Sequence, residues 1–326
     1  MIHPNVLHNG RIRASEELCL RTGQAGLFTG WGVFSTVKVA GGVLFAFERH
    51  WARMRKDAGL LRVPFPWSVE ELRGELLRVV EANGAADAAL RVLVVRNGGT
   101  MWSGPGAASD SDLVALTAAR SQWGESARLG LVPNARHAAS QFAGSKTTSW
   151  AMNLVWYEEA HLRGLDEVVL LNERGEVSEC TSANVFAVFG NEAVTPPLDS
   201  GCLPGITREL LLEAVRVPGI TVKEGRLGLE DLERADGVFI TSTTRDLLPV
   251  REIEGLAIGE DRKTRDALQE AFLAYQEDYC AQGRHGAERG TIAIRVYCRK
   301  GFRKVASIGQ SPVRAMSGVW QSRGAL

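Results

Sequence analysis

The chain has 326 residues, of which 45% are hydrophobic and 23% are charged, and its 38 basic residues balance 38 acidic ones. This length predicts two domains, and the neutral balance gives no sign of a nucleic-acid partner. No apolar run reaches about 18 residues and residues 1–5 do not begin a signal peptide, so we expect no membrane partner and a cytoplasmic protein. The 5 cysteines include no C-x-x-C pair, which favours reduced thiols over a metal site.

The first part of the sequence predicts a sheet with two helices. Residues 6–8 and 11–13 flank an Asn9-Gly10 pair, which is typical of a hairpin turn. Further strands are predicted over residues 32–39, 43–47, 89–96 and 113–119. Helices are predicted over residues 49–60 and 69–83, and Ser68 is expected to cap the second.

The remainder predicts a second unit. A connector with one strand at residues 129–133 leads to a helix that starts after Lys146 and ends near residue 163. Strands follow at residues 167–171, 185–189 and 237–241, and helices at 207–215 and 264–279. Strands and helices mix without strict alternation, which favours an α+β fold. We expect a small N-terminal domain (1–120), a connector (121–137), a larger domain (138–282) and a basic, poorly ordered tail (283–326).

Four segments carry the residue types that a chemical site needs. They are HWAR at 50–53, GSKTTSW at 144–150, VSECTSANVF at 177–186 and LPGITR at 203–208. Their order and spacing resemble the class IV aminotransferases, which are fold type IV pyridoxal-phosphate (PLP) enzymes. The family includes branched-chain aminotransferases, D-amino acid aminotransferases and aminodeoxychorismate lyases. The resemblance covers about residues 5–280 and implies a two-domain α+β fold like that of D-amino acid aminotransferase.

The resemblance also implies a set of cofactor residues. Lys146 matches the lysine that holds PLP as a Schiff base and then shuttles the substrate α-proton. Glu179 matches the acid that keeps the pyridine nitrogen protonated, because a carboxylate favours the charged ring. Arg53 matches the phosphate arginine, for which a guanidinium is well suited.

Further cofactor contacts are implied around a turn that begins a helix. Backbone N–H groups of Ile206 and Thr207 would face the phosphate, since a helix N-terminus favours an anion. Thr243 matches another phosphate ligand, and Leu203 is expected to pack beneath the ring. The substrate pocket is expected to include Phe34, Trp150 and Thr244, and possible further lining residues are Trp31, Met101 and Trp102.

Several departures from the family bear on the substrate. Trp150 stands where many members have a tyrosine that bonds the ring 3′-oxygen. Branched-chain enzymes usually have Glu-Gly-Ile-Arg at residues 35–38, where this chain has Ser-Thr-Val-Lys. The paired hydroxyl residues there, and the segment at 179–184, lean toward the lyases. The carboxylate-binding arginine and histidine of D-specific enzymes cannot be placed in residues 96–102.

Two activities therefore stay open. The first is transamination between an α-amino acid, branched-chain-like or related, and a 2-oxo acid. The alternative is 4-amino-4-deoxychorismate lyase activity, which forms 4-aminobenzoate and pyruvate. A non-catalytic protein would be expected to lack Lys146 or Glu179, and both are present. The resemblance further implies a homodimer with its site near the subunit interface.

Overall fold

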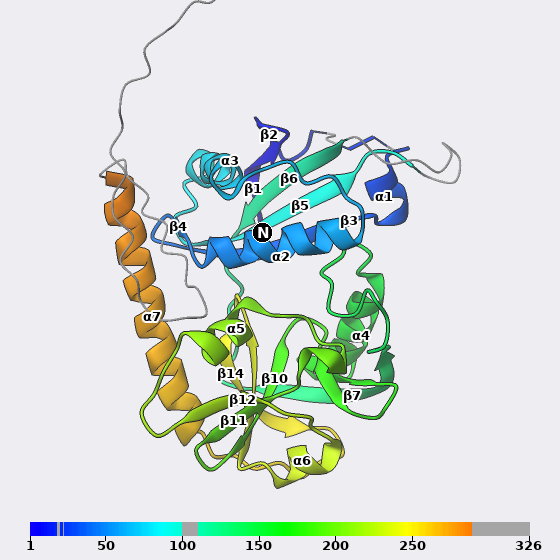
Figure 1. Cartoon of the computed structure of the whole chain (residues 1–326), viewed down its shortest axis with the longest axis vertical. Helices are drawn as coiled ribbons and strands as arrows, with labels where there is room; N and C mark the ends of the chain where they lie inside the picture. Colours follow the sequence, from blue (N-terminus) through cyan, green and yellow to red (C-terminus); the bar gives the residue numbers. More distant parts are fainter. Residues whose placement is uncertain (18–19, 22, 100–109, 289–326) are drawn as a thin grey trace, which may run out of the picture.

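Two β-sheets form the framework of the computed structural model, which describes residues 1–17, 20, 21, 23–99 and 110–288. The N-terminal sheet occupies the upper half of the molecule and the C-terminal sheet the lower half (Figure 1). Met101, Trp102 and residues 289–326 of the predicted tail lie outside the described residues. Among the described helices, none is long and apolar enough to cross a membrane.

The N-terminal sheet has the strand order β2-β1-β6-β5-β3-β4. Its strands pair antiparallel, and the Asn9-Gly10 turn has positive φ at both residues, which confirms the predicted hairpin. The strands are β1 (Ile2–His8), β2 (Arg11–Ala14), β3 (Gly32–Ala40), β4 (Val43–Leu44), β5 (Ala88–Arg96) and β6 (Ser111–Ala118).

Three helices accompany this sheet, namely α1 (Ala25–Thr29), α2 (Phe47–Leu60) and α3 (Val69–Ala82). Alternation along β5 directs Ala88, Leu90 and Val92 into the core beside α2 and α3. The intervening Ala89 and Arg91 therefore face the opposite side, where the cavity described below lies. Ser68 caps α3 in a capping box with Glu71, as the sequence predicts.

One predicted strand is wrong in extent. The strand expected over residues 43–47 ends at Leu44, and α2 already begins at Phe47. Ala46 adopts a left-handed conformation (φ 50°), which breaks the extended chain between the two elements. Phe45 instead packs its ring against aromatic residues of a distant helix.

The C-terminal sheet has the strand order β12-β11-β10-β13-β14-β7-β8-β9. Parallel pairs β14–β7, β7–β8 and β11–β12 are mixed with antiparallel ones, so this is an α+β arrangement. Its strands are β7 (Ala127–Arg136), β8 (Glu167–Asn172), β9 (Val177–Cys180), β10 (Asn184–Phe189), β11 (Glu192–Thr195), β12 (Thr221–Glu224), β13 (Gly237–Ser242) and β14 (Asp246–Ile253).

The helices of this half are α4 (Ala151–Leu162), the short 3₁₀ helix η1 (Leu198–Ser200), α5 (Ile206–Glu213), α6 (Leu229–Arg234) and α7 (Lys263–Glu288). Strand β7 extends beyond residues 129–133 and lies inside the C-terminal sheet, although the sequence places residues 121–137 in a connector. The predicted helix after Lys146 begins only at Ala151, so Lys146 lies in a loop. Strands β9, β11, β12 and β14 and helices α1 and α6 were not predicted.

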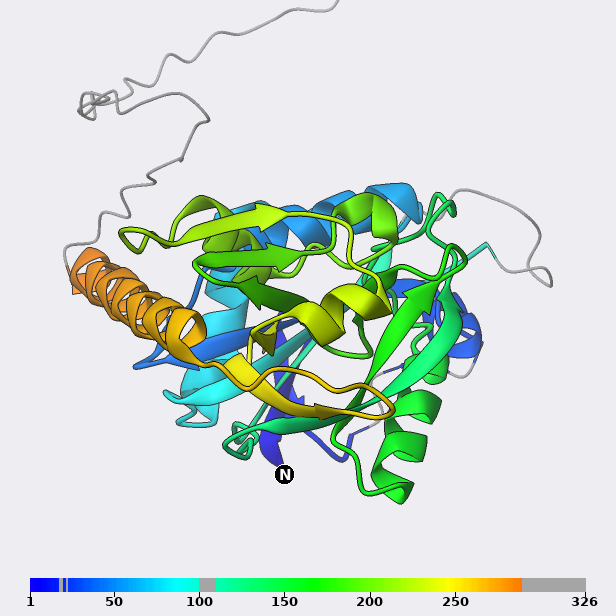
Figure 2. The same cartoon turned by 90° about the horizontal axis from the view of Figure 1, so that it is seen from below.

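Helix α7 joins the two halves along the outside of the molecule (Figure 1; Figure 2). It packs against β14 and β11 of one sheet and β4 of the other. The ring of Phe45 lies 5.9 Å from that of Phe272 and 5.3 Å from that of Tyr279. The Tyr279 hydroxyl also donates to Glu48 Oε2 at 2.7 Å. The helix continues beyond residue 282, where the predicted tail begins.

Candidate active site

A cavity of about 660 Å³ lies between the two sheets. Its walls come from β3, β5 and β6 on one side and from the loops of the C-terminal sheet on the other. It brings together the residues that the sequence nominated for the cofactor, and these are Arg53, Lys146, Glu179, Leu203, Ile206, Thr207 and Thr243. The predicted pocket residues Trp150 and Thr244 also line it.

Phe34 and Trp31 are not among the residues that line the cavity, although the Phe34 ring contacts three side chains that do. Phe34 is 3% exposed and lies behind the cavity wall, with Lys146 Nζ 4.6 Å from its ring centroid. The ring of Trp150 meets it edge-on at 5.7 Å. Trp31 packs against the N-terminal core and donates its indole N–H to the carbonyl of Leu61. Phe34 thus supports lining side chains from behind.

Lys146 lies between β7 and α4 of the C-terminal unit but is held by β3 and α2 of the N-terminal unit. Its N–H donates to Asp57 Oδ2 at 3.1 Å, and its carbonyl accepts the N–H of Phe34 at 3.1 Å. Thr147 forms an isolated bridge with Val33. These contacts explain why the chain does not enter a helix here, and they fix the point from which the side chain reaches the cavity.

The ammonium group of Lys146 loses its proton more readily than that of an exposed lysine. Burial, followed by the positive charge of Arg53, lowers the pKa of Lys146 to about 7, although Glu179 acts in the opposite direction. A far larger share of the amine is therefore neutral near pH 7 than in an exposed lysine, and only a neutral amine can act as a nucleophile or base. The location and the lowered pKa together suit a reactive lysine.

Glu179 is fixed by two donors at the end of β9. Arg136 Nε donates to Oε1 and the backbone N–H of Leu203 to Oε2, each at 3.0 Å. Arg136 also reaches Asn153 Oδ1 of α4 at 3.3 Å. The carboxylate is 9% exposed and lines the cavity, so it can present its remaining lone pairs to a cationic group there.

The turn at residues 203–205, directly before α5, packs closely against Asn184. Asn184 Nδ2 donates to the carbonyl of Leu203 at 2.9 Å, and a Cβ added to Gly205 would lie 2.0 Å from Asn184 Oδ1. Only glycine therefore fits this approach. Ile206 and Thr207 follow at the start of α5, where helix geometry leaves N–H groups without intrahelical acceptors.

The Arg53 guanidinium points at the same turn. Its Nη1 donates to the carbonyl of Pro204 at 3.1 Å and its Nη2 to Ser35 Oγ at 2.9 Å. Arg53 Nε is buried and makes no hydrogen bond with any described residue. Burial lowers the pKa of Arg53 to about 10, which keeps the side chain charged at neutral pH. The turn and the guanidinium form a concentration of donors that suits an anion.

Three functional candidates were missed by sequence reasoning. Arg91 lines the cavity from β5, its guanidinium carbon lies 4.8 Å from the Phe34 ring centroid, and no described residue forms an ion pair or hydrogen bond with it. Arg245 and Glu167 form a buried ion pair at 3.3 Å beside the Thr243–Thr244 loop. The alternation of β5 could have identified Arg91, whereas no local signal joins residues 167 and 245.

A model of the amino-transferase class IV family matches residues 32–253. The chain belongs to the class IV aminotransferases. This confirms the resemblance, the enzyme class and the PLP dependence expected from it.

Relatives within the family are distant. The branched-chain-amino-acid aminotransferase of Escherichia coli K12 is 28% identical over 288 residues, with 81% of this chain and 90% of the relative covered. The D-alanine aminotransferase of Bacillus licheniformis is also 28% identical, over 276 residues, with 82% and 97% covered. The overall level of identity therefore does not separate the two subfamilies.

Solved structures confirm the fold type. A branched-chain amino acid aminotransferase from E. coli has a TM-score of 0.77 at 26% identity and covers 84% of this chain and 94% of its own. A protein described as a putative 4-amino-4-deoxychorismate lyase, from Legionella pneumophila, has a TM-score of 0.74 at 23% identity, with 80% and 96% covered. The second likeness shows the fold alone.

The donors of this class IV aminotransferase fit PLP. The unpaired Nε of Arg53, the N–H groups of Ile206 and Thr207 and the close approach at Gly205 suit its phosphate. Lys146 has the neutral amine that an aldehyde requires, and Glu179 has lone pairs for a protonated pyridine nitrogen.

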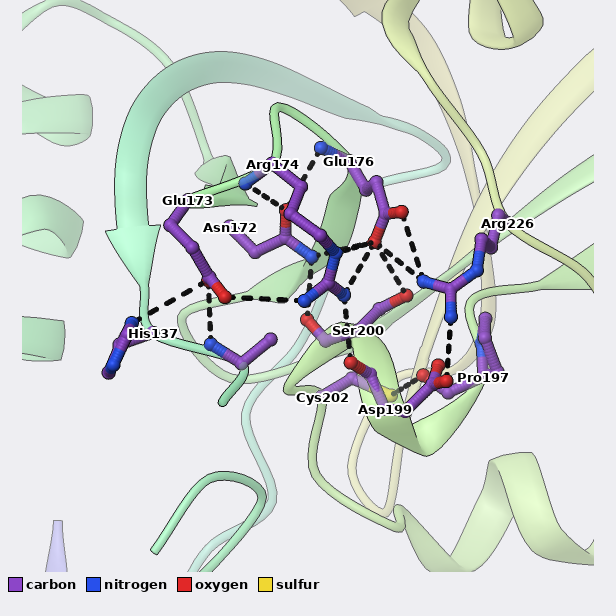
Figure 3. A network of polar contacts seen from close by, with 11 residues as sticks. His137, Asn172, Glu173, Arg174, Glu176, Pro197, Asp199, Ser200, Cys202 and Arg226 are labelled. Atoms are coloured by element: carbon purple, nitrogen blue, oxygen red, sulfur yellow. Dashed lines mark hydrogen bonds and ion pairs between the residues drawn. The ribbon is translucent and has the colours of Figure 1, made fainter. Parts of the chain in front are cut away.

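A polar network stabilises the loop that carries this turn (Figure 3). Glu176 accepts hydrogen bonds from Arg174 and Arg226, and these donors lower the pKa of Glu176 to about 2. Arg226 also donates to Asp199 Oδ2 at 2.6 Å, and Asn172 to the carbonyl of Ser200 at 3.3 Å. These contacts fix the loop at residues 197–202, which directly precedes Leu203, to the turn between β8 and β9.

Proposed function

We propose that this class IV aminotransferase moves an amino group between an α-amino acid and a 2-oxo acid, with Lys146 holding PLP covalently. The observation that supports this most is the position of the Lys146 amine. It lines the cavity with a pKa lowered to about 7, within the electrostatic influence of both Arg53 and Glu179. A lysine that both binds an aldehyde and transfers a proton needs such a pKa.

Each residue around the cavity has its own role in the proposed reaction. Bound PLP supplies a ring that withdraws electrons from the substrate α-carbon. Lys146 Nζ would take the proton from that carbon and return it at the cofactor C4′, two bonds away, since the amine is neutral enough to accept it at pH 7. Glu179 holds the proton at the pyridine nitrogen. Arg53, Ile206 and Thr207 bind the phosphate, and Trp150 closes the cavity beside Lys146 and excludes water.

Arg91 is our choice for binding a substrate carboxylate. It is a cation that faces the cavity without an acidic partner among the described residues, and a carboxylate can accept two of its N–H groups. The neighbouring wall carries Ala89, Leu116 and Ala118, which suit an aliphatic side chain. A branched-chain-like donor, as the E. coli relative's name suggests, fits this combination of apolar wall and cation.

Lyase activity is the second candidate, and Thr36 is the observation in its favour. Its side chain lines the cavity from β3, where the lyases often show paired threonines. The two reactions use the same lysine and differ in whether an amino group stays on the cofactor.

A two-armed assay on the purified, PLP-loaded protein tests the proposal. One arm offers L-leucine, L-glutamate, L-alanine or D-alanine and follows conversion of the visible cofactor absorption to the near-ultraviolet amine form. The other offers aminodeoxychorismate and follows 4-aminobenzoate. Conversion that a 2-oxo acid reverses supports transamination. Release of 4-aminobenzoate without an accumulating amine form would show that the lyase is the correct assignment.

We also propose a homodimer. Apolar side chains are exposed around the cavity side of α1 and α4, and a second copy would cover them. These exposed side chains include Met152 (68%), Val155 (58%), Phe28 (53%), Leu27 (52%) and Leu154 (51%). Light scattering coupled to size-exclusion chromatography should give twice the mass of the chain, and Val155→Asp should shift the protein toward the monomer. A monomeric wild-type protein would contradict this proposal.

The free thiols of Cys180, Cys202 and Cys280 accord with the proposed cytoplasmic location.

A further inference from the structure

Ser35 connects two buried basic side chains beneath the cofactor turn. Its Oγ lies 2.8 Å from His50 Nδ1 and accepts the N–H of Arg53 Nη2 at 2.9 Å. Ser35, His50 and Arg53 are 0%, 1% and 8% exposed. A hydroxyl at this depth needs its hydrogen bonds, so the three groups hold one arrangement.

These contacts determine which way the guanidinium of Arg53 faces. Of its five N–H groups, one donates to Pro204 and one to Ser35. The buried Nε and the second hydrogen on each Nη make no hydrogen bond with a described residue. Because Pro204 and Ser35 hold the two Nη atoms, the guanidinium plane cannot rotate, and the remaining donors keep a constant direction.

The arrangement steers Arg53 without a negative charge. Ser35 is neutral, and burial, followed by the charges of Arg53 and Lys146, lowers the pKa of His50 well below its usual value, so His50 is neutral as well. Asp57 and Glu209 influence Arg53 only through space, since no described carboxylate forms an ion pair with it. The hydroxyl of Ser35 therefore accepts from the guanidinium without placing a negative charge beside it.

We propose that Ser35 and His50 are positioning residues for the cofactor phosphate, an uncharged hydroxyl–imidazole pair that orients Arg53 and leaves its charge for the phosphate. The inference rests on the proposed role of Arg53. It assigns to this chain's Ser35 a purpose distinct from any contact with substrate, because Ser35 is on the face of β3 that packs toward α2.

The experiment compares two ligands that differ only in the phosphate. Cofactor-free full-length protein is titrated with PLP and with pyridoxal, and binding is followed by visible absorption. We expect Ser35→Ala to weaken PLP binding about tenfold, in line with a hydrogen bond to a charged group, and to change pyridoxal binding less than about twofold. Ser35→Thr keeps the hydroxyl and should restore PLP binding.

The deciding quantity is the affinity for PLP divided by the affinity for pyridoxal, because only PLP carries the phosphate. Equal losses for PLP and pyridoxal in Ser35→Ala, or no loss for PLP, would overturn the positioning role. His50→Leu should lower the same ratio, and an unchanged ratio would remove His50 from the proposal. Arg53→Gln separates this inference from the proposed function. If it lowers the ratio while Ser35→Ala does not, the inference alone fails. If Arg53→Gln leaves the ratio unchanged, the phosphate role of Arg53 fails as well.

Discussion

The backbone N–H of Leu203 donates to Glu179 Oε2 at 3.0 Å. This bond joins the acid at the end of β9 to the turn that begins α5, so the two parts of the proposed cofactor site cannot shift independently. Asn184 adds a second connection between the same elements through the carbonyl of Leu203. Glu179, proposed for the ring nitrogen, and the start of α5, proposed for the phosphate, therefore belong to one connected unit. Lys146 approaches this unit from a loop held by β3.

Replacing Lys146 tests the covalent attachment directly. Lys146→Ala should abolish the visible absorption of bound PLP and reduce turnover by at least about 10³-fold, because the nucleophile and the base are the same group. Absorption spectra and initial rates are the measurements. Lys56→Ala, at an exposed position of α2, is the matched control and should behave as the wild type. Turnover retained in Lys146→Ala would exclude the assignment.

The lowered pKa of Lys146 predicts a pH dependence of cofactor attachment. The neutral amine attacks PLP, so the attachment rate should rise with pH around a midpoint near 7 rather than near 10.5. Arg91 lowers this pKa and Glu179 raises it. Arg91→Gln should therefore move the midpoint up and Glu179→Gln should move it down. Stopped-flow absorption over a pH series measures both, and shifts in the same direction would contradict this account.

Glu179 should matter more for turnover than for retention of the cofactor. Glu179→Ala leaves Lys146 and the phosphate donors in place but no longer holds a proton at the pyridine nitrogen. We expect PLP to stay bound and exchange of the substrate α-proton to slow by about 10²-fold or more. Deuterium exchange from labelled leucine gives the rate. An exchange rate close to wild type would place the acid elsewhere.

Gly205 should tolerate no side chain. Gly205→Ala places a Cβ against Asn184 Oδ1 and pushes the turn away from β10, which should weaken PLP binding about tenfold or more, equivalent to ~1.4 kcal/mol. Gly74→Ala, in the interior of α3 with open space around it, is the control. It should raise the free energy of unfolding by about 0.5–1 kcal/mol and leave PLP binding unchanged. Equal PLP binding by both variants would contradict the close approach.

The sequence predicts the elements whose signals are local. The Asn9-Gly10 turn, the Ser68 cap and the strand at residues 89–96 each depend on neighbouring residues, and each is confirmed. The helix expected after Lys146 is confirmed as α4, but its predicted start is wrong, because residues 146–148 bond to β3. Strand β14 contains Pro249, which argues against a strand from sequence alone, yet it pairs on both sides in the sheet.

In the candidate site, too, residues with a local sequence signal were predicted and residues placed by distant contacts were not. The four motifs nominate residues that the fold brings to one cavity, because each motif carries residue types with their own chemistry. The second layer depends on contacts between distant residues. Arg245 and Glu167 lie 78 positions apart, and Ser35 meets His50 and Arg53 only after β3 and α2 have packed. Phe34 shares one face of β3 with Thr36, which lines the cavity, and its ring contacts the side chains of Lys146 and Trp150.

Helix α7 also sets an order on the synthesis of this protein. The strands of the N-terminal sheet are complete by residue 118 and those of the C-terminal sheet by residue 253, so each half can form as soon as its own strands have left the ribosome. The contacts of Phe272 and Tyr279 with Phe45 follow only later. The two walls of the cavity can already meet through Arg53 with Pro204 and Thr147 with Val33, and the α7 contacts across the two halves are the last that a nascent chain can add.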